Sequence, residues 1–176
     1  RFDMAALDPV GADRLHLLIE AGRLAYAVRN RYVADPDFMQ MPVASLLDRK
    51  FAAELAGLID RNKRSAFPKL PKPPSSTVLC CVVDRDRNAV TIINSLFSTF
   101  GSGITAEKSG ILLHHRGSGF NLDPASPNCI GPSKRPLHTI IPGLAKRDGH
   151  VDMAVGVMGG AYQAVGHAHF IDNRVG

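Results

Sequence analysis

The sequence has no tryptophan, only three cysteines and no apolar run near the length of a membrane-spanning helix. A helix needs about 20 apolar residues to cross a bilayer, so no such span is expected. An odd number of cysteines, two of them adjacent at Cys80 and Cys81, does not form a disulfide framework. If these two lie on a strand they face opposite ways, so they are not expected to share a metal. Unpaired cysteines favour a reducing compartment.

The net charge of +5 does not by itself indicate a nucleic-acid-binding protein. The dense basic run covers residues 61–72 and is rich in proline, which is typical of a solvated linker. No basic surface interleaved with aromatic residues and no helix-turn-helix pattern accompanies it. Binding to nucleic acid is therefore not expected.

Helical periodicity dominates the first third of the chain. Residues 11–33 place apolar side chains on one stripe, with Asp13 as the expected N-cap. Residues 34–38 (ADPDF) break this helix, and a second helix is predicted over 45–60, with Asp48 near its start. Both helices are interpreted as packing elements.

The character of the sequence changes at residues 65–76, SAFPKLPKPPSS, which predict a linker or an exposed loop. Five β-strand candidates follow, the first two forming a hairpin: 77–84, 88–97, 110–115, 138–145 and 150–157. A further helix is predicted over 161–173. The order of helices, linker and strands fits either two domains or a precursor with a processing site at the junction.

Several apparent site signals are weak. His114 and His115 are adjacent, and His167 and His169 would not share a helical face, so neither pair is expected to hold a metal. The Gly-Ser-Gly segments lack both the nucleophile-elbow and the phosphate-loop pattern. A triad of residues far apart in sequence stays open.

Thr77 is the remaining candidate, because it is the first residue after the linker and the first of a strand. Cleavage of the bond between Ser76 and Thr77 would give it a free α-amino group, whose ordinary pKa is about 7.7–8.0. That amine could act as general base for its own hydroxyl. A threonine at the start of a strand is also common for structural reasons alone.

The motifs around Thr77 resemble the junction of the two subunits in γ-glutamyltranspeptidases. The start of the small subunit is matched by TVLCCVVDRDRNAV (77–90), FGSGI (100–104) and SGILL (109–113). The end of the large subunit is matched by EAGRLAYA (20–27) and YVADPDF (32–38), and GPSKRPL (131–137) and MGG (158–160) continue the order. The resemblance runs over essentially the whole chain.

This resemblance implies an N-terminal-nucleophile (Ntn) hydrolase of the α+β class, with a four-layer αββα sandwich that is present here only in part. It implies that residues 1–76 end the large subunit and carry the linker, and that 77–176 begin the small, catalytic subunit. By the same resemblance Thr77 cuts the chain and is then the nucleophile, Ser95 supports it, and Gly159 and Gly160 form the oxyanion hole. Neither a metal nor an organic cofactor is implied.

The donor pocket departs from the family pattern. Phe97 and Gly119 stand where an asparagine and an aspartate bind the donor's α-amino group, and His138 and Thr139 replace paired serines that bind its carboxylate. A buried ammonium without acceptors is costly, so these exchanges are not neutral. Arg135 and His138 are candidates for substrate contact, with a structural salt bridge and a strand-end histidine as the alternatives.

The variant pattern resembles a γ-glutamyltranspeptidase-like subgroup that includes oxamate amidohydrolase and proteins labelled cephalosporin acylase. The expected partners are a small amide substrate, of glutathione type or not, and the remaining parts of both subunits, with a homo-oligomer left open. An inert, unprocessed homologue is the rival interpretation. The subgroup implies a cytoplasmic protein, or a periplasmic one if a signal peptide precedes the chain.

Overall fold

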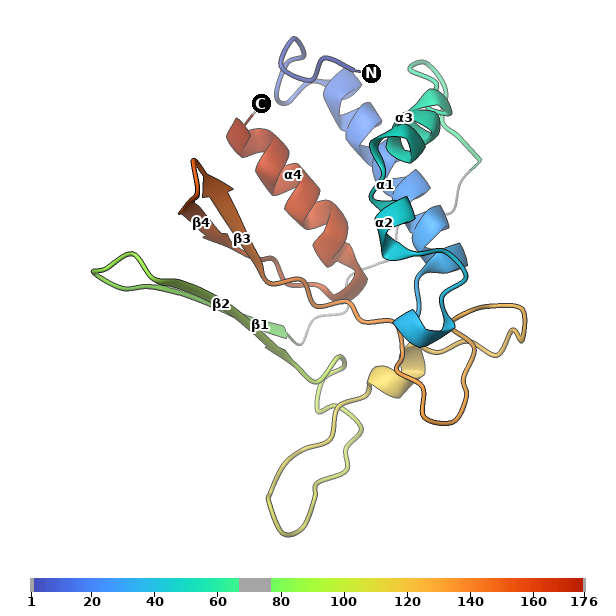
Figure 1. Cartoon of the computed structure of the whole chain (residues 1–176), viewed down its shortest axis with the longest axis vertical. Coiled ribbons are helices and arrows are strands. Elements are labelled where there is room, and N and C mark those ends of the chain that lie inside the picture. Colours follow the sequence, from blue (N-terminus) through green and yellow to red (C-terminus); the bar gives the residue numbers. More distant parts are fainter. Residues whose placement is uncertain (1, 67–76, 176) are drawn as a thin grey trace. The chain divides into compact units, whose positions relative to one another are not determined.

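The computed structural model describes residues 2–66 and 77–175, which form two compact units (Figure 1). The helical unit comprises residues 2–66, 119–137 and 171–175, and the hairpin unit comprises residues 77–118 and 138–170. The predicted linker at 65–76 lies outside the described residues except for its first two positions. None of the helices within the described ranges is long and apolar enough to cross a membrane.

The helical unit is built on one long helix and three short ones. These elements are α1 (Ala12–Tyr32), η1 (Pro36–Phe38), α2 (Val43–Leu46) and α3 (Arg49–Gly57). The core forms where Leu17 and Leu24 of α1 meet Ile59, with Leu55 of α3 packed against them. The long first helix and the break after it are confirmed.

Two details of the helix predictions are wrong. Gly11, not Asp13, is the N-cap of α1, and no side chain caps it; Asp13 lies in the first turn, where its charge suits the helix dipole. The helix predicted over 45–60 is interrupted, because the side chain of Asp48 accepts the N–H groups of Lys50 and Phe51 at 2.8 and 3.0 Å. That cap starts α3 and separates it from α2.

Two buried charged residues of α1 bind Ser65, the first residue of the predicted linker. Arg23 donates to Glu20 at 2.7 Å, and both side chains are buried. Glu20 accepts the backbone N–H of Ser65 at 3.0 Å, and Arg23 donates to the Ser65 carbonyl at 2.9 Å. The buried ion pair therefore fixes both backbone polar groups of Ser65.

Two antiparallel hairpins form the hairpin unit. Their strands are β1 (Thr77–Val83), β2 (Ala89–Ser95), β3 (Gly143–Arg147) and β4 (His150–Val155), paired β1 with β2 and β3 with β4. After β4 come η3 (Gly160–Tyr162) and α4 (Gln163–Val175), whose last residues belong to the helical unit. The first hairpin, the strand at 150–157 and the last helix are confirmed, and the chain is a mixed α+β protein.

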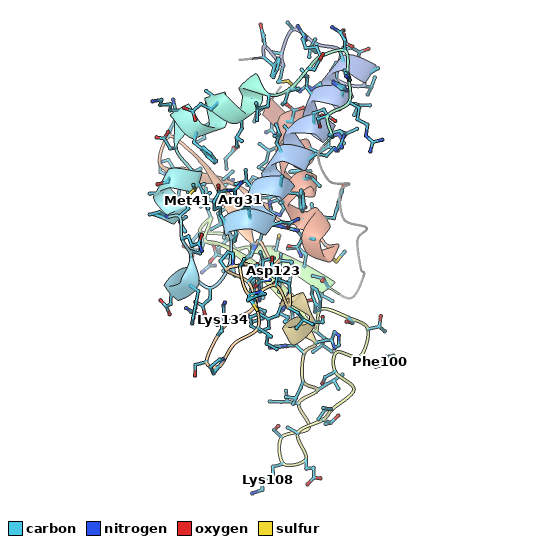
Figure 2. The ribbon with its side chains drawn as sticks, turned by 90° about the vertical axis from the view of Figure 1, so that its right-hand side faces the viewer. Arg31, Met41, Phe100, Lys108, Asp123 and Lys134 are labelled. Carbon is cyan, nitrogen blue, oxygen red and sulfur yellow. The ribbon has the colours of Figure 1, made fainter. Side chains whose placement is uncertain are left out.

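The strand predicted over 110–115 is wrong. Backbone hydrogen bonds join Ile111 and Leu113 to residues 102–106, but they form an isolated bridge, Thr105 with Leu112, and not a regular strand. This segment lies in a long loop after β2 whose tip carries Lys108 (Figure 2). The prediction over 138–145 is half right, because the strand begins only at Gly143. Pro142 has no N–H, and the N–H of Ile141 donates to the side chain of Gln163 at 2.9 Å, so neither can join a ladder.

The two hairpins contact each other. The hydroxyl of Thr91 in β2 donates to the carbonyl of Gly143 in β3 at 3.0 Å. Gly156, just after β4, lies so close to Leu79 of β1 that a Cβ at this glycine would sit 2.5 Å from the Leu79 side chain. The segment that follows β4 therefore runs beside β1 near its first residue, Thr77.

Candidate active site at the start of the first hairpin

Thr77 and Ser95 face each other at the open end of the first hairpin. They are register partners at the first position of β1 and the last of β2. The Thr77 hydroxyl donates to the Ser95 hydroxyl at 3.0 Å, and Ser95 Oγ also accepts the N–H of Phe97 at 3.0 Å. The hairpin register thus places a hydroxyl that orients Thr77 Oγ1.

Phe97 lies directly beyond this pair in a strained conformation. Its φ is +75°, which is uncommon for a residue with a side chain. The ring lies under the guanidinium of Arg116, with Cζ 5.3 Å from the ring centroid. Arg116 is 5% exposed, and no carboxylate within the described parts of the chain forms a salt bridge with it.

Arg116 connects Phe97 to two further residues that were predicted to line the pocket, Thr139 and His138. It donates to the hydroxyl of buried Thr139 at 3.2 Å. The side chain of His138 is partly desolvated, which lowers its pKa, and the positive charges of Arg116 and His114 lower that pKa further. Burial also lowers the pKa of Arg116. The structure therefore groups Phe97, Thr139 and His138 around an arginine that the sequence analysis did not single out.

Gly159 and Gly160 are buried and both have positive φ, 122° and 56°. They sit where the segment after β4 turns into η3 and then α4, and the N–H of Tyr162 donates to the Gly159 carbonyl at 3.0 Å. The φ of Gly159 is accessible only to glycine in practice. Backbone N–H groups at such a turn can bind an anionic oxygen.

Two side chains of α4 accept backbone N–H groups from the segments just before β3 and just after β4. His167 Nε2 accepts the N–H of Val157 at 3.2 Å, and burial lowers the pKa of this histidine. Gln163 accepts the N–H of Ile141 and is 1% exposed. Sequence reasoning gave neither residue a role, because periodicity does not reveal a side chain that bonds to a distant backbone.

Arg135 lies in the helical unit and is engaged by acidic side chains. Its backbone N–H, Nε and Nη2 all donate to Asp35, at 2.8, 3.1 and 2.7 Å, and Nη2 also approaches Asp37 at 3.4 Å. Asp35 is buried, whereas the arginine side chain is largely exposed. This geometry agrees with the structural salt bridge, and a substrate contact by Arg135 stays a prediction. Gly119, also in the helical unit, accepts a hydrogen bond from Asn128.

The bond to Arg135 holds the pKa of Asp35 well below its ordinary value. A carboxyl whose pKa is depressed by folding stabilises the protein above its unfolded pKa, about 3.9, and loses that contribution as the pH falls. We expect Asp35→Asn to lower the melting temperature at neutral pH, by a margin that narrows below about pH 4. Thermal unfolding across that range measures it.

Asp37→Asn is the matched control for this experiment, because Asp37 is exposed and its contact with Arg135 is longer. We expect Asp37→Asn to change the melting temperature little at any pH in this range. A stability loss in Asp35→Asn that is constant with pH, or equal to that of the control, would contradict the assignment.

Among residues 2–66 and 77–175, no cluster of three or more histidines, cysteines or acidic residues could hold a metal ion. The three cysteines are free, with Cys80 and Cys81 exposed on β1. Around Thr77 and Phe97 the described residues offer the hydroxyl groups of Thr77, Ser95 and Thr139 and the buried guanidinium of Arg116.

Comparisons with known proteins agree on one family. The model of the gamma-glutamyltranspeptidase family matches residues 1–175. The glutathione hydrolase proenzyme of Escherichia coli is 35% identical over 91% of this chain, and the oxamate amidohydrolase proenzyme of Klebsiella pneumoniae is 37% identical over 91% of it. This chain spans about 30% of the length of each of these relatives.

A solved structure is also similar. A cephalosporin acylase from Bacillus halodurans aligns with a TM-score of 0.82 and 31% identity, covering 98% of this chain and 32% of that chain. Glutathione hydrolases, an oxamate amidohydrolase and an acylase are thus all relatives of the chain.

Proposed function

The chain belongs to the gamma-glutamyltranspeptidase family, and on this premise we propose that the full-length protein is a self-cleaving Ntn amidohydrolase with Thr77 as nucleophile. One observation carries the proposal: the hydroxyl of Thr77, at the first residue of β1, is held 3.0 Å from the hydroxyl of Ser95. A nucleophile at the start of a strand needs such an orienting partner. The proenzyme names of the relatives support the self-cleavage.

The proposal includes the architecture of the whole protein. We infer the four-layer αββα sandwich, to which this chain contributes helices and two hairpins. The subunit boundary lies between Ser76 and Thr77, so residues 1–76 end the large subunit and 77–176 begin the small one. The remaining parts of both subunits complete the fold and the pocket.

In the first reaction Thr77 Oγ1 attacks the carbonyl carbon of Ser76. The C–N bond breaks, the acyl group passes from nitrogen to oxygen, and water hydrolyses the resulting ester. The products are a carboxylate at Ser76 and a free α-amino group on Thr77. Its ordinary pKa of about 7.7–8.0 lets a useful fraction of this amine act as a base at neutral pH.

In the second reaction the amine takes the proton of Thr77 Oγ1, which attacks the substrate amide. The N–H groups of Gly159 and Gly160 stabilise the oxyanion of the tetrahedral intermediate. The proton passes to the departing amine, and an acyl-enzyme remains. Water releases the acid, or an amine acceptor takes the acyl group. Ser95 keeps the nucleophile oriented throughout.

The substrate is a γ-glutamyl compound or another small amide. One observation favours a non-γ-glutamyl donor. Phe97 offers an apolar ring where the family's pattern has an acceptor for the donor's ammonium, and Arg116 places a positive charge over that ring. Assays of the purified full-length protein with γ-glutamyl-p-nitroanilide and with oxamate separate the two substrate classes. A protein that remains uncut and turns over neither substrate would contradict the proposed function.

Ser95→Ala tests the orienting role. The change removes the oxygen that accepts from both Thr77 and Phe97, so we expect kcat/KM for amide hydrolysis to fall roughly 10-fold. Ser95→Thr keeps the hydroxyl and should retain most of the activity. Steady-state kinetics on fully processed protein give the comparison. Wild-type kinetics in the alanine variant would remove Ser95 from the mechanism.

A further inference from the structure

The buried guanidinium of Arg116 lacks a carboxylate partner within the described residues. It is 5% exposed, and its hydrogen bond goes to a neutral hydroxyl, that of Thr139. Burying a cation is costly unless an anion compensates it. The other deeply buried arginines described here do have carboxylates: Arg14 has Asp172 and Arg23 has Glu20. Among the described residues Arg116 therefore differs from these two arginines, and a bound anion would stabilise it.

The position of this arginine is tied to the nucleophile. The N–H of His115 donates to the carbonyl of Leu96 at 2.8 Å, which fixes the chain at Arg116 to the residue after Ser95. The guanidinium then lies over the ring of Phe97, whose N–H is bonded to Ser95. A short series of direct contacts therefore connects the cation to the hydroxyl pair of Thr77 and Ser95.

Two histidines, His114 and His138, lie near Arg116 in the described structure. Burial lowers the pKa of His138, and the positive charges of Arg116 and His114 lower it further. Thr139 accepts from Arg116, so its own hydroxyl hydrogen can donate to a further oxygen. A planar guanidinium beside a hydroxyl donor suits a carboxylate and repels an ammonium.

We propose that Arg116 and Thr139 bind a carboxylate in the acyl part of the substrate. The substrates are then monoamides of short dicarboxylic acids, and they do not need an α-ammonium group. This inference rests on the proposed function, since it assigns the acyl pocket of the same nucleophile. Arg116 is then the residue that determines specificity, and Phe97 forms the apolar floor below it.

Three p-nitroanilides that differ in one group each test this proposal on the full-length protein. The γ-glutamyl compound carries a carboxylate and an ammonium, the glutaryl compound keeps only the carboxylate, and the 4-carbamoylbutanoyl compound replaces that carboxylate with a neutral amide. We expect kcat/KM for the glutaryl compound to equal or exceed that for the γ-glutamyl compound. The kcat/KM for the glutaryl compound should exceed the kcat/KM for the neutral 4-carbamoylbutanoyl compound by roughly 10- to 100-fold, the range for hydrogen bonds to a charged group.

Variants then assign the preference to Arg116. Arg116→Gln should lower kcat/KM for the glutaryl compound by roughly 10- to 100-fold, mainly through KM, and leave the neutral compound little changed. Arg116→Lys, which keeps the charge, should retain part of the preference. Arg147→Gln is the control, because Arg147 is an exposed arginine whose partner is Asp152 in the second hairpin; it should leave the preference unaltered.

The outcomes separate this inference from the function on which it rests. An uncut wild-type protein without amidase activity contradicts the proposed function. A cut, active protein that hydrolyses the neutral anilide as well as the glutaryl one overturns the role of Arg116 alone. The same conclusion follows if the preference survives in cut Arg116→Gln. If that variant fails to fold, the substrate series on the wild type and the lysine variant still decide.

Discussion

Thr77→Ala should abolish both cleavage of the chain and amide hydrolysis. The alanine has no oxygen to attack the Ser76 carbonyl, so the protein should remain a single polypeptide. The same missing oxygen removes the acyl-enzyme route. We expect amide hydrolysis to fall by a factor on the order of a million, as when the nucleophile of a serine protease is removed. Denaturing mass measurement and a p-nitroanilide assay report the two effects.

A split protein separates the two roles of Thr77. The large and small subunits are expressed as two polypeptides, the second beginning with methionine followed by Thr77 or by alanine, so that methionine removal exposes the new N-terminus. We expect amide hydrolysis when the small subunit begins with Thr77 and none when it begins with alanine, although neither split protein needs self-cleavage. Equal activity in the two pairs would restrict Thr77 to processing.

Gly159→Ala is expected to have the next largest effect. The φ of 122° at Gly159 is accessible only to glycine in practice, so a Cβ should strain the turn that carries the two proposed oxyanion donors. Loss of one oxyanion donor typically costs about 100- to 1000-fold in kcat, and we expect a decrease near the lower limit with little change in KM. Kinetics on the processed variant test this.

Gly149→Ala is the matched control for Gly159→Ala. Gly149 also has positive φ, +81°, but it lies in the turn between β3 and β4 with open space around its Cβ position. Its replacement brings backbone strain without displacing a proposed oxyanion donor. If both variants lose activity equally, or if Gly159→Ala keeps the wild-type kcat, the oxyanion role of Gly159 is wrong.

Local patterns predicted the regular elements of this chain well where a single segment decides the outcome. The hairpin of β1 and β2 follows from two β-branched runs around a polar turn, and α1 follows from one apolar stripe. Where distant groups compete for backbone hydrogen bonds, the pattern failed. The run at 110–115 has strand composition, but its backbone hydrogen bonds to residues 102–106 produce only an isolated bridge. Gln163 accepts the N–H of Ile141, and β3 begins only two residues later.

The candidate site shows the same division. Motif order led to Thr77 and Ser95, and the hairpin register then placed their hydroxyls within hydrogen-bonding distance. Arg116 had no signal in the sequence, because neither burial nor the lack of a carboxylate can be read from the residues around it. Arg135, chosen from a motif, proved to be bonded to Asp35, a partner 100 residues away.

The most direct test of this account is the mass of the full-length wild-type protein, measured under denaturing conditions after incubation at neutral pH. The account predicts two polypeptides that meet between Ser76 and Thr77, with masses that sum to the uncut chain plus one water. A correctly folded protein that stays in one piece would contradict it, since Thr77 would then have no free amine and the family's motif would persist without its chemistry.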